Sequence, residues 1–83
     1  MKITLKMYAS LAPYLPQGAV HNAIAIDVKE DESVFGIIDR YHVPRESAHL
    51  VLINGLYVEP VDRESPILKE GDVLALWPPV AGG

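Results

Sequence analysis

The run from Val73 to Trp77 is apolar at every position and is followed at once by Pro78 and Pro79. Alternate residues of a strand point to opposite faces of a sheet, so a strand that is apolar throughout needs cover on both faces. Pro78 has no amide hydrogen for a ladder and ends the strand. The run therefore predicts a central strand, covered by a helix on one face and partly by loops or a partner protein on the other.

The chain has 83 residues, of which 49% are hydrophobic, so it has room for one domain around one core. We expect residues 1–77 to form this domain. Residues 78–83 are expected to form a flexible C-terminal Gly-Gly tail, because the prolines stop the last strand and no apolar pattern follows them.

Two further apolar patterns predict a hairpin at the amino-terminal end. Apolar and polar residues alternate over residues 2–8, which is typical of a strand with one buried face. Residues 23–29 place Ile24, Ile26 and Val28 on one side of a second strand. The segment between them contains Pro13 and Pro16 and is expected to be a connecting loop with one helical turn.

An amphipathic helix is expected after the acidic run 30–32. Ser33 is a suitable N-cap, and the acidic residues lie near the positive end of the helix dipole. The helical spacing of the apolar residues places four of them on one face: Val34, Ile37, Ile38 and Tyr41. Pro44 disfavours helical geometry in the residue before it, so the helix should end near His42 or Val43.

A second hairpin is expected around Asn54-Gly55, which separates two apolar runs, residues 49–53 and 56–58. A type I′ turn needs positive φ at both central residues, and Asn-Gly provides it. Residues 59–66 read as turns. The element order is therefore strand, strand, helix, strand, short strand, strand, which indicates an α+β fold with one main helix packed on one face of a mixed sheet of four to five strands.

Composition excludes several classes of function. The net charge is −4 and no two basic residues are adjacent, so nucleic acid is not an expected ligand. No apolar run has the length of a membrane span or a signal peptide, and we expect a cytoplasmic protein with no membrane partner. Cysteine is absent, which rules out thiolate metal sites and a cysteine nucleophile. The three histidines, His21, His42 and His49, share no predicted face, so neither a metal nor a bound cofactor is expected.

Three segments carry a resemblance to a known family: INGLYV after the helix, LKEGDVLAL entering the last strand, and the ending WPPVAGG. Together they resemble the MoaD/ThiS sulfur-carrier family, and PPVAGG is most similar to the ending of the small subunit of molybdopterin synthase. The resemblance covers the chain in length and element order. It implies that the sheet and helix form a β-grasp, or ubiquitin-like, fold.

The same resemblance implies a role for each residue of the ending. Gly83 would be adenylated by an ATP-dependent enzyme of the ubiquitin-activating type (MoeB/ThiF-like), converted to a thiocarboxylate, and used to donate sulfur. Gly82 would be its required neighbour. Four residues would form the arm that enters partner active sites: Pro78, Pro79, Val80 and Ala81. Trp77 stands where the family usually has phenylalanine. A large subunit of molybdopterin synthase (MoaE-like) would be the second partner.

The chemistry of the ending is consistent with that role. Glycine permits close backbone approach to a reactive centre, and two prolines favour an extended arm that loses little entropy on docking. Residues 78–83 span roughly 20 Å when extended. A terminal thiocarboxylate is nucleophilic, which supplies the reactivity that the missing cysteines cannot. The chain alone is not expected to be a catalyst, since it contains no phosphate-binding loop and no nucleophile-base spacing.

Other functions remain open from the sequence. The sulfur could serve thiamine or another metabolite, the activated tail could form isopeptide bonds with lysines as a protein modifier, or the domain could be a non-covalent interaction module. Tyr57 and Trp77 are candidate partner-binding residues, because aromatic residues near the exit of a tail are frequent interface anchors. For Tyr57, ordinary packing at a sheet edge is an equally good interpretation.

Overall fold

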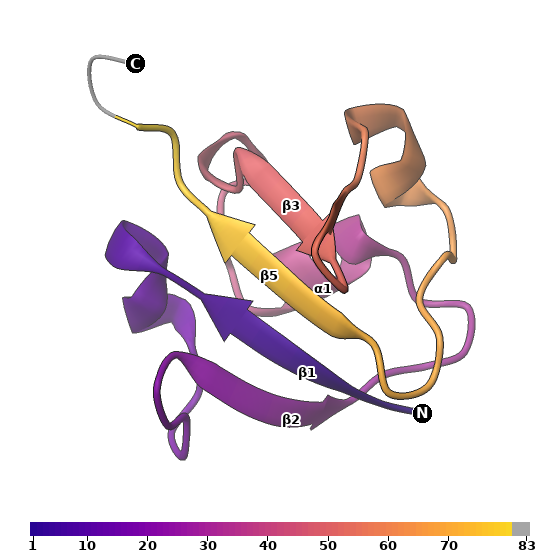
Figure 1. Cartoon of the computed structure of the whole chain (residues 1–83), viewed down its shortest axis with the longest axis horizontal. Coiled ribbons are helices and arrows are strands. Elements are labelled where there is room, and N and C mark those ends of the chain that lie inside the picture. Colours follow the sequence, from indigo (N-terminus) through magenta and orange to yellow (C-terminus); the bar gives the residue numbers. More distant parts are fainter. Residues whose placement is uncertain (81–83) are drawn as a thin grey trace.

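The computed structural model describes residues 1–80, which form a five-stranded mixed sheet and one α-helix (Figure 1). The strands are β1 (Lys2–Met7), β2 (Ala23–Asp27), β3 (Leu50–Ile53), β4 (Leu56–Tyr57) and β5 (Val73–Trp77). The helix is α1 (Val34–Arg40), and three 3₁₀ helices lie in the connections: η1 (Ala9–Tyr14), η2 (Arg45–Ser47) and η3 (Pro60–Glu64). Within residues 1–80, no helix has the length and apolar character needed to cross a membrane.

β5 is the central strand, as its two-sided apolar sequence predicts. The strand order is β2-β1-β5-β3-β4. β5 runs parallel to β1, with Leu5 opposite Leu74, and antiparallel to β3, with Val51 opposite Leu76. The parallel pair requires a long connection, which contains β2, α1 and the β3–β4 hairpin. The chain therefore returns to the middle of the sheet only with its last strand.

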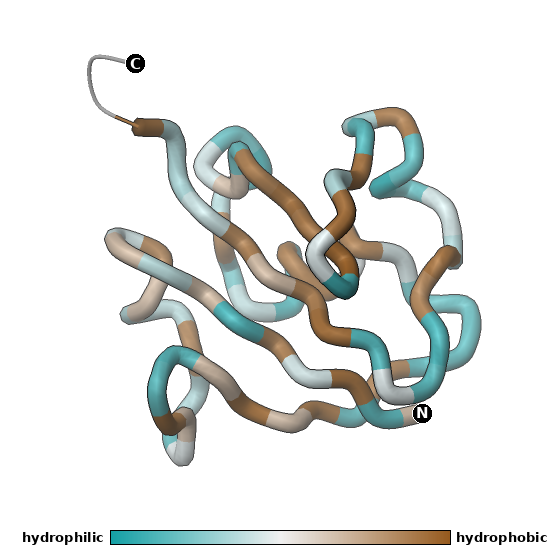
Figure 2. The backbone as a smooth tube through the Cα atoms, in the orientation of Figure 1, coloured by the Kyte–Doolittle hydropathy of each residue, from teal (hydrophilic) through white to brown (hydrophobic). Residues whose placement is uncertain are grey.

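The core lies between the sheet and α1, which covers one face (Figure 1). Directly opposite residues on neighbouring strands share a face, so the registers place the side chains of Leu5, Val51, Leu74 and Leu76 together. All four have no exposed surface, and they meet the buried helix residues Val34, Ile37 and Ile38. Full burial of such a side chain contributes roughly 1.5–3 kcal/mol. The apolar strands are conspicuous as brown segments of the tube in Figure 2.

Both predicted hairpins are confirmed. β1 and β2 pair antiparallel, with Leu5 opposite Ile24. In the second hairpin, Asn54 and Gly55 have φ of 52° and 83°, which is the geometry that a type I′ turn requires. The Asn54 amide also donates to the Asp72 carboxylate at 2.9 Å and accepts from the Val73 amide at 2.8 Å. The turn is thereby attached to the start of β5.

The helix begins as predicted but ends earlier. The Ser33 hydroxyl accepts from the Gly36 amide at 3.0 Å, which confirms the N-cap. The expected end near His42 or Val43 is wrong, because α1 ends at Arg40 and His42 has a left-handed φ of 64°. This conformation reverses the chain so that Val43 enters the core, where it is 3% exposed.

The acidic run lies just before the helix rather than in its first turn, which contains no acidic residue. Glu32 accepts from the Lys29 amide at 3.1 Å and forms an ion pair with Arg40. The contacts of the Glu32 carboxylate are therefore this hydrogen bond and this ion pair. The second local difference lies in residues 59–66, which the sequence reads as turns: they contain η3, whose Arg63 is buried.

Candidate partner-binding face and tail

The sheet face opposite α1 carries apolar side chains without a covering layer of secondary structure. We call it the open face and define it from the strand registers: Lys6 and Leu52 lie opposite Ala75, Leu50 lies opposite Trp77, and Tyr57 lies opposite Leu52. Figure 1 looks onto this side of the sheet, with α1 behind it.

The open face is only partly buried. Leu50 is 36% exposed and Tyr57 is 51% exposed, whereas Leu52 and Trp77 are half-buried. Large apolar side chains that neighbour one another on a surface are typical of a site that binds another protein. The face thus has the composition of a partner-binding surface.

Trp77 is held at one end of this face by an aromatic stack. Its ring lies 4.3 Å from that of Tyr8, centroid to centroid, with 8° between the ring planes. The Tyr8 amide donates to the Leu76 carbonyl at 3.2 Å, and the His49 amide donates to the Trp77 carbonyl at 3.0 Å. These bonds continue the pairing of β1 and β3 with the last residues of β5. Trp77 is consequently fixed on both sides.

The tail leaves the sheet directly beside this stack. Pro78 is half-buried, Pro79 is exposed, and Val80 is 78% exposed. Figure 1 shows the described part of the tail leading away from the end of β5. Three predicted site residues, Ala81, Gly82 and Gly83, lie outside the described residues. The structure therefore brings Trp77 and Pro78 together with the open face, and Tyr57 lies two strands away on the edge strand β4.

Tyr57 is in contact with the buried Arg63. The Arg63 guanidinium lies 5.7 Å from the centre of the Tyr57 ring, and its Nη2 donates to the Tyr57 hydroxyl at 3.4 Å. Half of the Tyr57 surface remains exposed. Tyr57 thus packs against Arg63 at the sheet edge and still has exposed surface, so both interpretations of Tyr57, partner contact and edge packing, remain predictions.

Charge is sparse on the open face and is paired on the helix side. Lys6 is the one charged member of the set that defines the open face, and it is half-buried. On the helix side, Arg45 donates two hydrogen bonds to Asp39, at 3.2 and 2.8 Å, which hold the pKa of the Asp39 carboxyl below its ordinary value. Farther along the same sheet face, Lys2 pairs with its register partner Asp27 at 3.2 Å, so both sides of the molecule carry paired charges.

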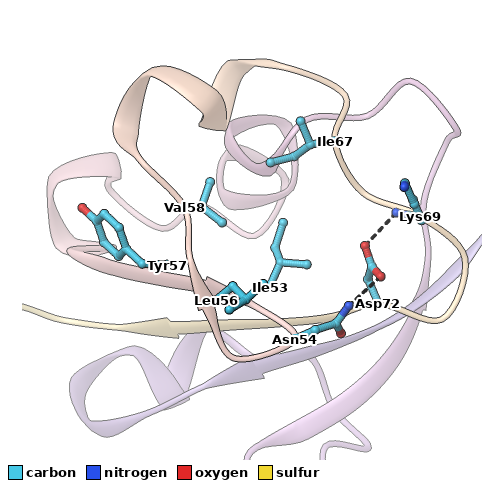
Figure 3. A pocket seen from close by; sticks show the side chains of 8 residues that line it. All are labelled: Ile53, Asn54, Leu56, Tyr57, Val58, Ile67, Lys69 and Asp72. Carbon is cyan, nitrogen blue, oxygen red and sulfur yellow. Dashed lines mark hydrogen bonds between the residues drawn. The ribbon is translucent and has the colours of Figure 1, made fainter.

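A shallow pocket of about 300 Å³ lies at the other end of β5, away from the tail (Figure 3). Its apolar lining comes from the second hairpin and the segment before β5: Ile53, Leu56, Val58 and Ile67. Asp72 at its rim accepts from the Asn54 amide and from the Lys69 backbone, so its carboxylate is engaged within the fold. The pocket is thus an apolar depression whose polar lining groups are Asn54, Tyr57, Lys69 and Asp72.

Within the described residues, no group of three histidine, aspartate or glutamate side chains is placed to hold a metal ion. The arrangement at the tail exit can present a tail beside an apolar surface.

Sequence reasoning missed two residues of this region. Tyr8 continues the alternation of Lys2, Thr4 and Lys6, so its place on the open face was available from the period of the strand. Arg63 lies in the turn-rich segment, where no periodic pattern marks it for burial. Only the packing of η3 on the second hairpin reveals it.

Comparison with known proteins places this geometry in context. The family model of the ThiS family matches residues 18–83. No curated protein matches the sequence. Among solved structures, small archaeal modifier protein 1 of Haloferax volcanii is 28% identical, with 95% of this chain and 98% of that chain covered and a TM-score of 0.65.

Two further structures share the fold at lower identity. The HVO 2177 protein of Haloferax volcanii is 24% identical, with 100% of this chain and 87% of that chain covered and a TM-score of 0.77. A chain from the complex of subunits 1 and 2 of molybdopterin-converting factor from Helicobacter pylori is 20% identical over 100% of both chains, with a TM-score of 0.61.

These likenesses confirm the predicted β-grasp fold, with a mixed five-stranded sheet and one main helix. The family match covers β2, α1, the second hairpin, β5 and the residues of the tail, and leaves out β1, which contributes Lys6 to the open face. The chain accordingly belongs to the ThiS family and is a ubiquitin-like protein of the sulfur-carrier type.

Proposed function

We propose that this chain carries sulfur as a thiocarboxylate on Gly83 and donates it in molybdopterin synthesis, as the small subunit of a molybdopterin synthase. The observation that carries the proposal is the exit of the tail: the central strand β5 ends at Trp77, beside an apolar open face, and delivers Pro78 to Val80 outward. A partner that docks on the open face would receive the tail in a fixed direction. The fold likeness to a chain of molybdopterin-converting factor supports this choice of pathway.

The chemistry requires two partners. A carboxylate is a poor electrophile, so an adenylyltransferase of the MoeB/ThiF type first joins the Gly83 carboxylate to the α-phosphate of ATP, and pyrophosphate leaves. Hydrosulfide then attacks the carbonyl carbon of the acyl adenylate, the bond from this carbon to the AMP oxygen breaks, and AMP leaves, which gives the thiocarboxylate. The large synthase subunit would bind the acceptor and draw in the tail. In this scheme ATP binds to the activating enzyme, and the carrier supplies a docking surface and a terminus in the cytoplasm.

Each predicted tail residue has a physical task in this scheme. Gly82 and Gly83 lack side chains, which lets the backbone approach the reacting phosphate closely. Pro78 and Pro79 restrict the arm to extended conformations, which lowers the entropy lost on docking. Val80 and Ala81 contribute small apolar contacts to the channel. Trp77 and Tyr57 belong to the docking surface.

Intact mass spectrometry tests the proposal directly. The purified chain is incubated with a MoeB/ThiF-type enzyme, ATP and a sulfur source, and the expected product has one oxygen replaced by sulfur. Deletion of Gly83 should abolish the exchange, and an alanine appended after Gly83 should do the same, while thermal unfolding stays unchanged. Absence of exchange in the wild-type chain with every enzyme of this type in the cell would refute sulfur carriage.

A second candidate function is protein modification, which the 28% identity to small archaeal modifier protein 1 favours. Adenylation of the tail is common to both functions, so the acceptor decides between them. Lysine-linked conjugates that disappear on deletion of Gly83 would identify a modifier. Sulfur transfer to a molybdopterin precursor in a reconstituted reaction would identify the synthase subunit, and transfer to a thiazole or another metabolite would identify a different carrier. Full cellular function without Gly82 and Gly83 would leave a non-covalent interaction module.

A further inference from the structure

Arg63 is a charged side chain in an apolar setting. It lies on η3 and is 5% exposed, and within residues 1–80 no carboxylate forms an ion pair with it. Removal of a guanidinium from water costs several kcal/mol unless polar groups replace the lost hydration. Hydrogen bonds to neutral groups must therefore compensate the buried charge of Arg63. The positions of these groups indicate what Arg63 does.

Four oxygen atoms surround the Arg63 guanidinium. Nε donates to the Val58 carbonyl at 3.1 Å and Nη1 donates to the Ala48 carbonyl at 3.2 Å. Nη2 donates to the His49 carbonyl and to the Tyr57 hydroxyl, each at 3.4 Å. The planar fork of arginine carries five N–H donors in fixed directions, so it can reach acceptors on several segments at once.

These acceptors lie where the second hairpin opens. The Val58 amide donates to the Val51 carbonyl at 2.9 Å, just past the end of β4. Beyond this bond no further ladder pairing between β3 and β4 is present in residues 1–80, and the guanidinium bridges the Val58 carbonyl on one segment to the Ala48 and His49 carbonyls on the other. Because β4 has two residues, this bridge is a large part of what fixes its end.

The hydrogen bonds of Arg63 connect it to both aromatic residues of the docking surface, Tyr57 and Trp77. Arg63 holds the Tyr57 hydroxyl directly. Its Nη1 also holds the Ala48 carbonyl, which shares a peptide group with the His49 amide, and this amide donates to the Trp77 carbonyl at 3.0 Å, where the tail begins. A single side chain thus connects the edge strand, the start of β3 and the last residue of β5.

We propose that Arg63 is a positioning residue of the open face, which closes the second hairpin and fixes Tyr57 and the His49–Trp77 junction for docking of the activating enzyme. The positioning itself is a property of this chain alone, whereas its value for docking rests on the proposed function. Lysine cannot replace Arg63, because one ammonium at the end of a flexible stem does not span the four acceptors on two segments, residues 48–49 and 57–58.

Amide hydrogen exchange tests the positioning without any partner. The variants are Arg63→Met, Arg63→Lys and a control, Arg45→Met, which removes an arginine from the helix side, where its guanidinium lies 4.3 Å from the Phe35 ring. In both Arg63 variants, the His49 and Val58 amides should exchange about tenfold faster relative to the Thr4 amide, which donates to Asp72 at 2.9 Å. The control should leave this ratio unchanged. Equal acceleration of all three amides would show a general loss of stability and overturn the inference.

Steady-state adenylation kinetics test the docking role at a temperature where every variant is folded. Arg63→Met and Arg63→Lys should raise the KM for the carrier by about tenfold and leave kcat within about twofold, because docking is impaired and the terminus is intact. Tyr57→Phe, which removes only the hydroxyl, should raise the KM by about threefold, and Arg45→Met should not change it. An unchanged KM in the Arg63 variants would overturn the docking role.

The two experiments separate the two proposals. If the wild-type chain is not adenylated by any enzyme of the ubiquitin-activating type, the proposed function fails and the docking role fails with it. The exchange experiment still decides whether Arg63 positions the hairpin. If adenylation proceeds and the exchange ratio is unchanged in the Arg63 variants, the proposed function stands and the inference about Arg63 is wrong.

Discussion

The two faces of the sheet are built from the same strands and serve different ends. On the helix-covered face, Leu74 and Leu76 of β5 have no exposed surface, and they pack with the residues of α1. On the open face, Trp77 of the same strand remains half-buried and Leu50 opposite it is 36% exposed. Apolar side chains that stay exposed in the free chain leave water only when a partner covers them, so the free energy of their burial favours binding. The covered face therefore supplies stability, and under the proposed function the open face supplies recognition.

Leu76→Ala, on the covered face, should have the largest effect on folding. Loss of a buried leucine side chain leaves a cavity and lowers the free energy of unfolding by about 2–5 kcal/mol. Small domains have about 5–15 kcal/mol in total, so the variant should be close to unfolding at physiological temperature. Urea denaturation measures the change. If the variant retained wild-type stability, the assignment of stability to this face would be wrong.

Trp77→Ala, on the open face, should have the largest effect on recognition. Removal of an aromatic anchor at a protein interface costs about 2 kcal/mol or more, so the KM for the carrier in adenylation should rise about 30-fold. The loss of stability should be smaller than that of Leu76→Ala. Trp77→Phe keeps the stack with Tyr8 and serves as the matched control, with a KM within about threefold of wild type. A KM for Trp77→Ala equal to that of the control would remove Trp77 from the docking surface.

Lys6→Glu probes charge on the open face. Lys6 is half-buried, lies opposite Ala75 in the register, and has no ion-pair partner within residues 1–80. We expect an acidic group of the partner to face it, so charge reversal should slow association by about tenfold at low salt and less at high salt. Stability should change by about 0.5 kcal/mol or less. Lys29→Glu, an exposed lysine outside the open face, is the charge-matched control, and equal effects of both variants would indicate only a dependence on net charge.

The smallest effect is expected on the helix side, from the pair of Asp39 and Arg45. Arg45 lowers the pKa of the Asp39 carboxyl from its ordinary value of 3.8. The folded pKa lies below the unfolded one, so the pair contributes stability above 3.8, and this contribution is lost as the pH falls through the folded pKa. Both side chains are half-exposed, so the contribution is small. Asp39→Asn should slightly reduce the urea midpoint at neutral pH and flatten its fall in acid, and adenylation should be unaffected.

The order of the elements and most of their bounds follow from the sequence. Period-2 alternation gave β1, Asn54-Gly55 gave the second hairpin, and Ser33 gave the start of α1. Each of these signals is local, because it depends on backbone preferences and side-chain direction within a few residues. The end of α1 was placed too late, because His42 takes the left-handed conformation that glycine usually marks at this position, and the His42 and Val43 amides donate back to the Asp39 and Ile38 carbonyls.

The residues of the candidate site likewise divide into those that a local sequence signal predicts and those that it does not. The ending WPPVAGG marks the tail residues by sequence alone, and alternation along β1 was sufficient to place Tyr8 on the open face. Nothing local marked Arg63, because its burial depends on carbonyl groups of residues 48, 49 and 58, which only the closed second hairpin brings to it.

By itself, the sequence determined a single domain with a central last strand, one covering helix and a side-chain-free terminus, because these follow from the spacing of apolar residues and from the chemistry of proline and glycine. Only the tertiary structure decided that β1, β3 and β4 join Trp77, Leu50 and Tyr57 into one open face, and that Arg63 holds its edge. The physical reason is that strand order and register are set by packing between segments far apart in the chain, and no local preference encodes which of them become neighbours.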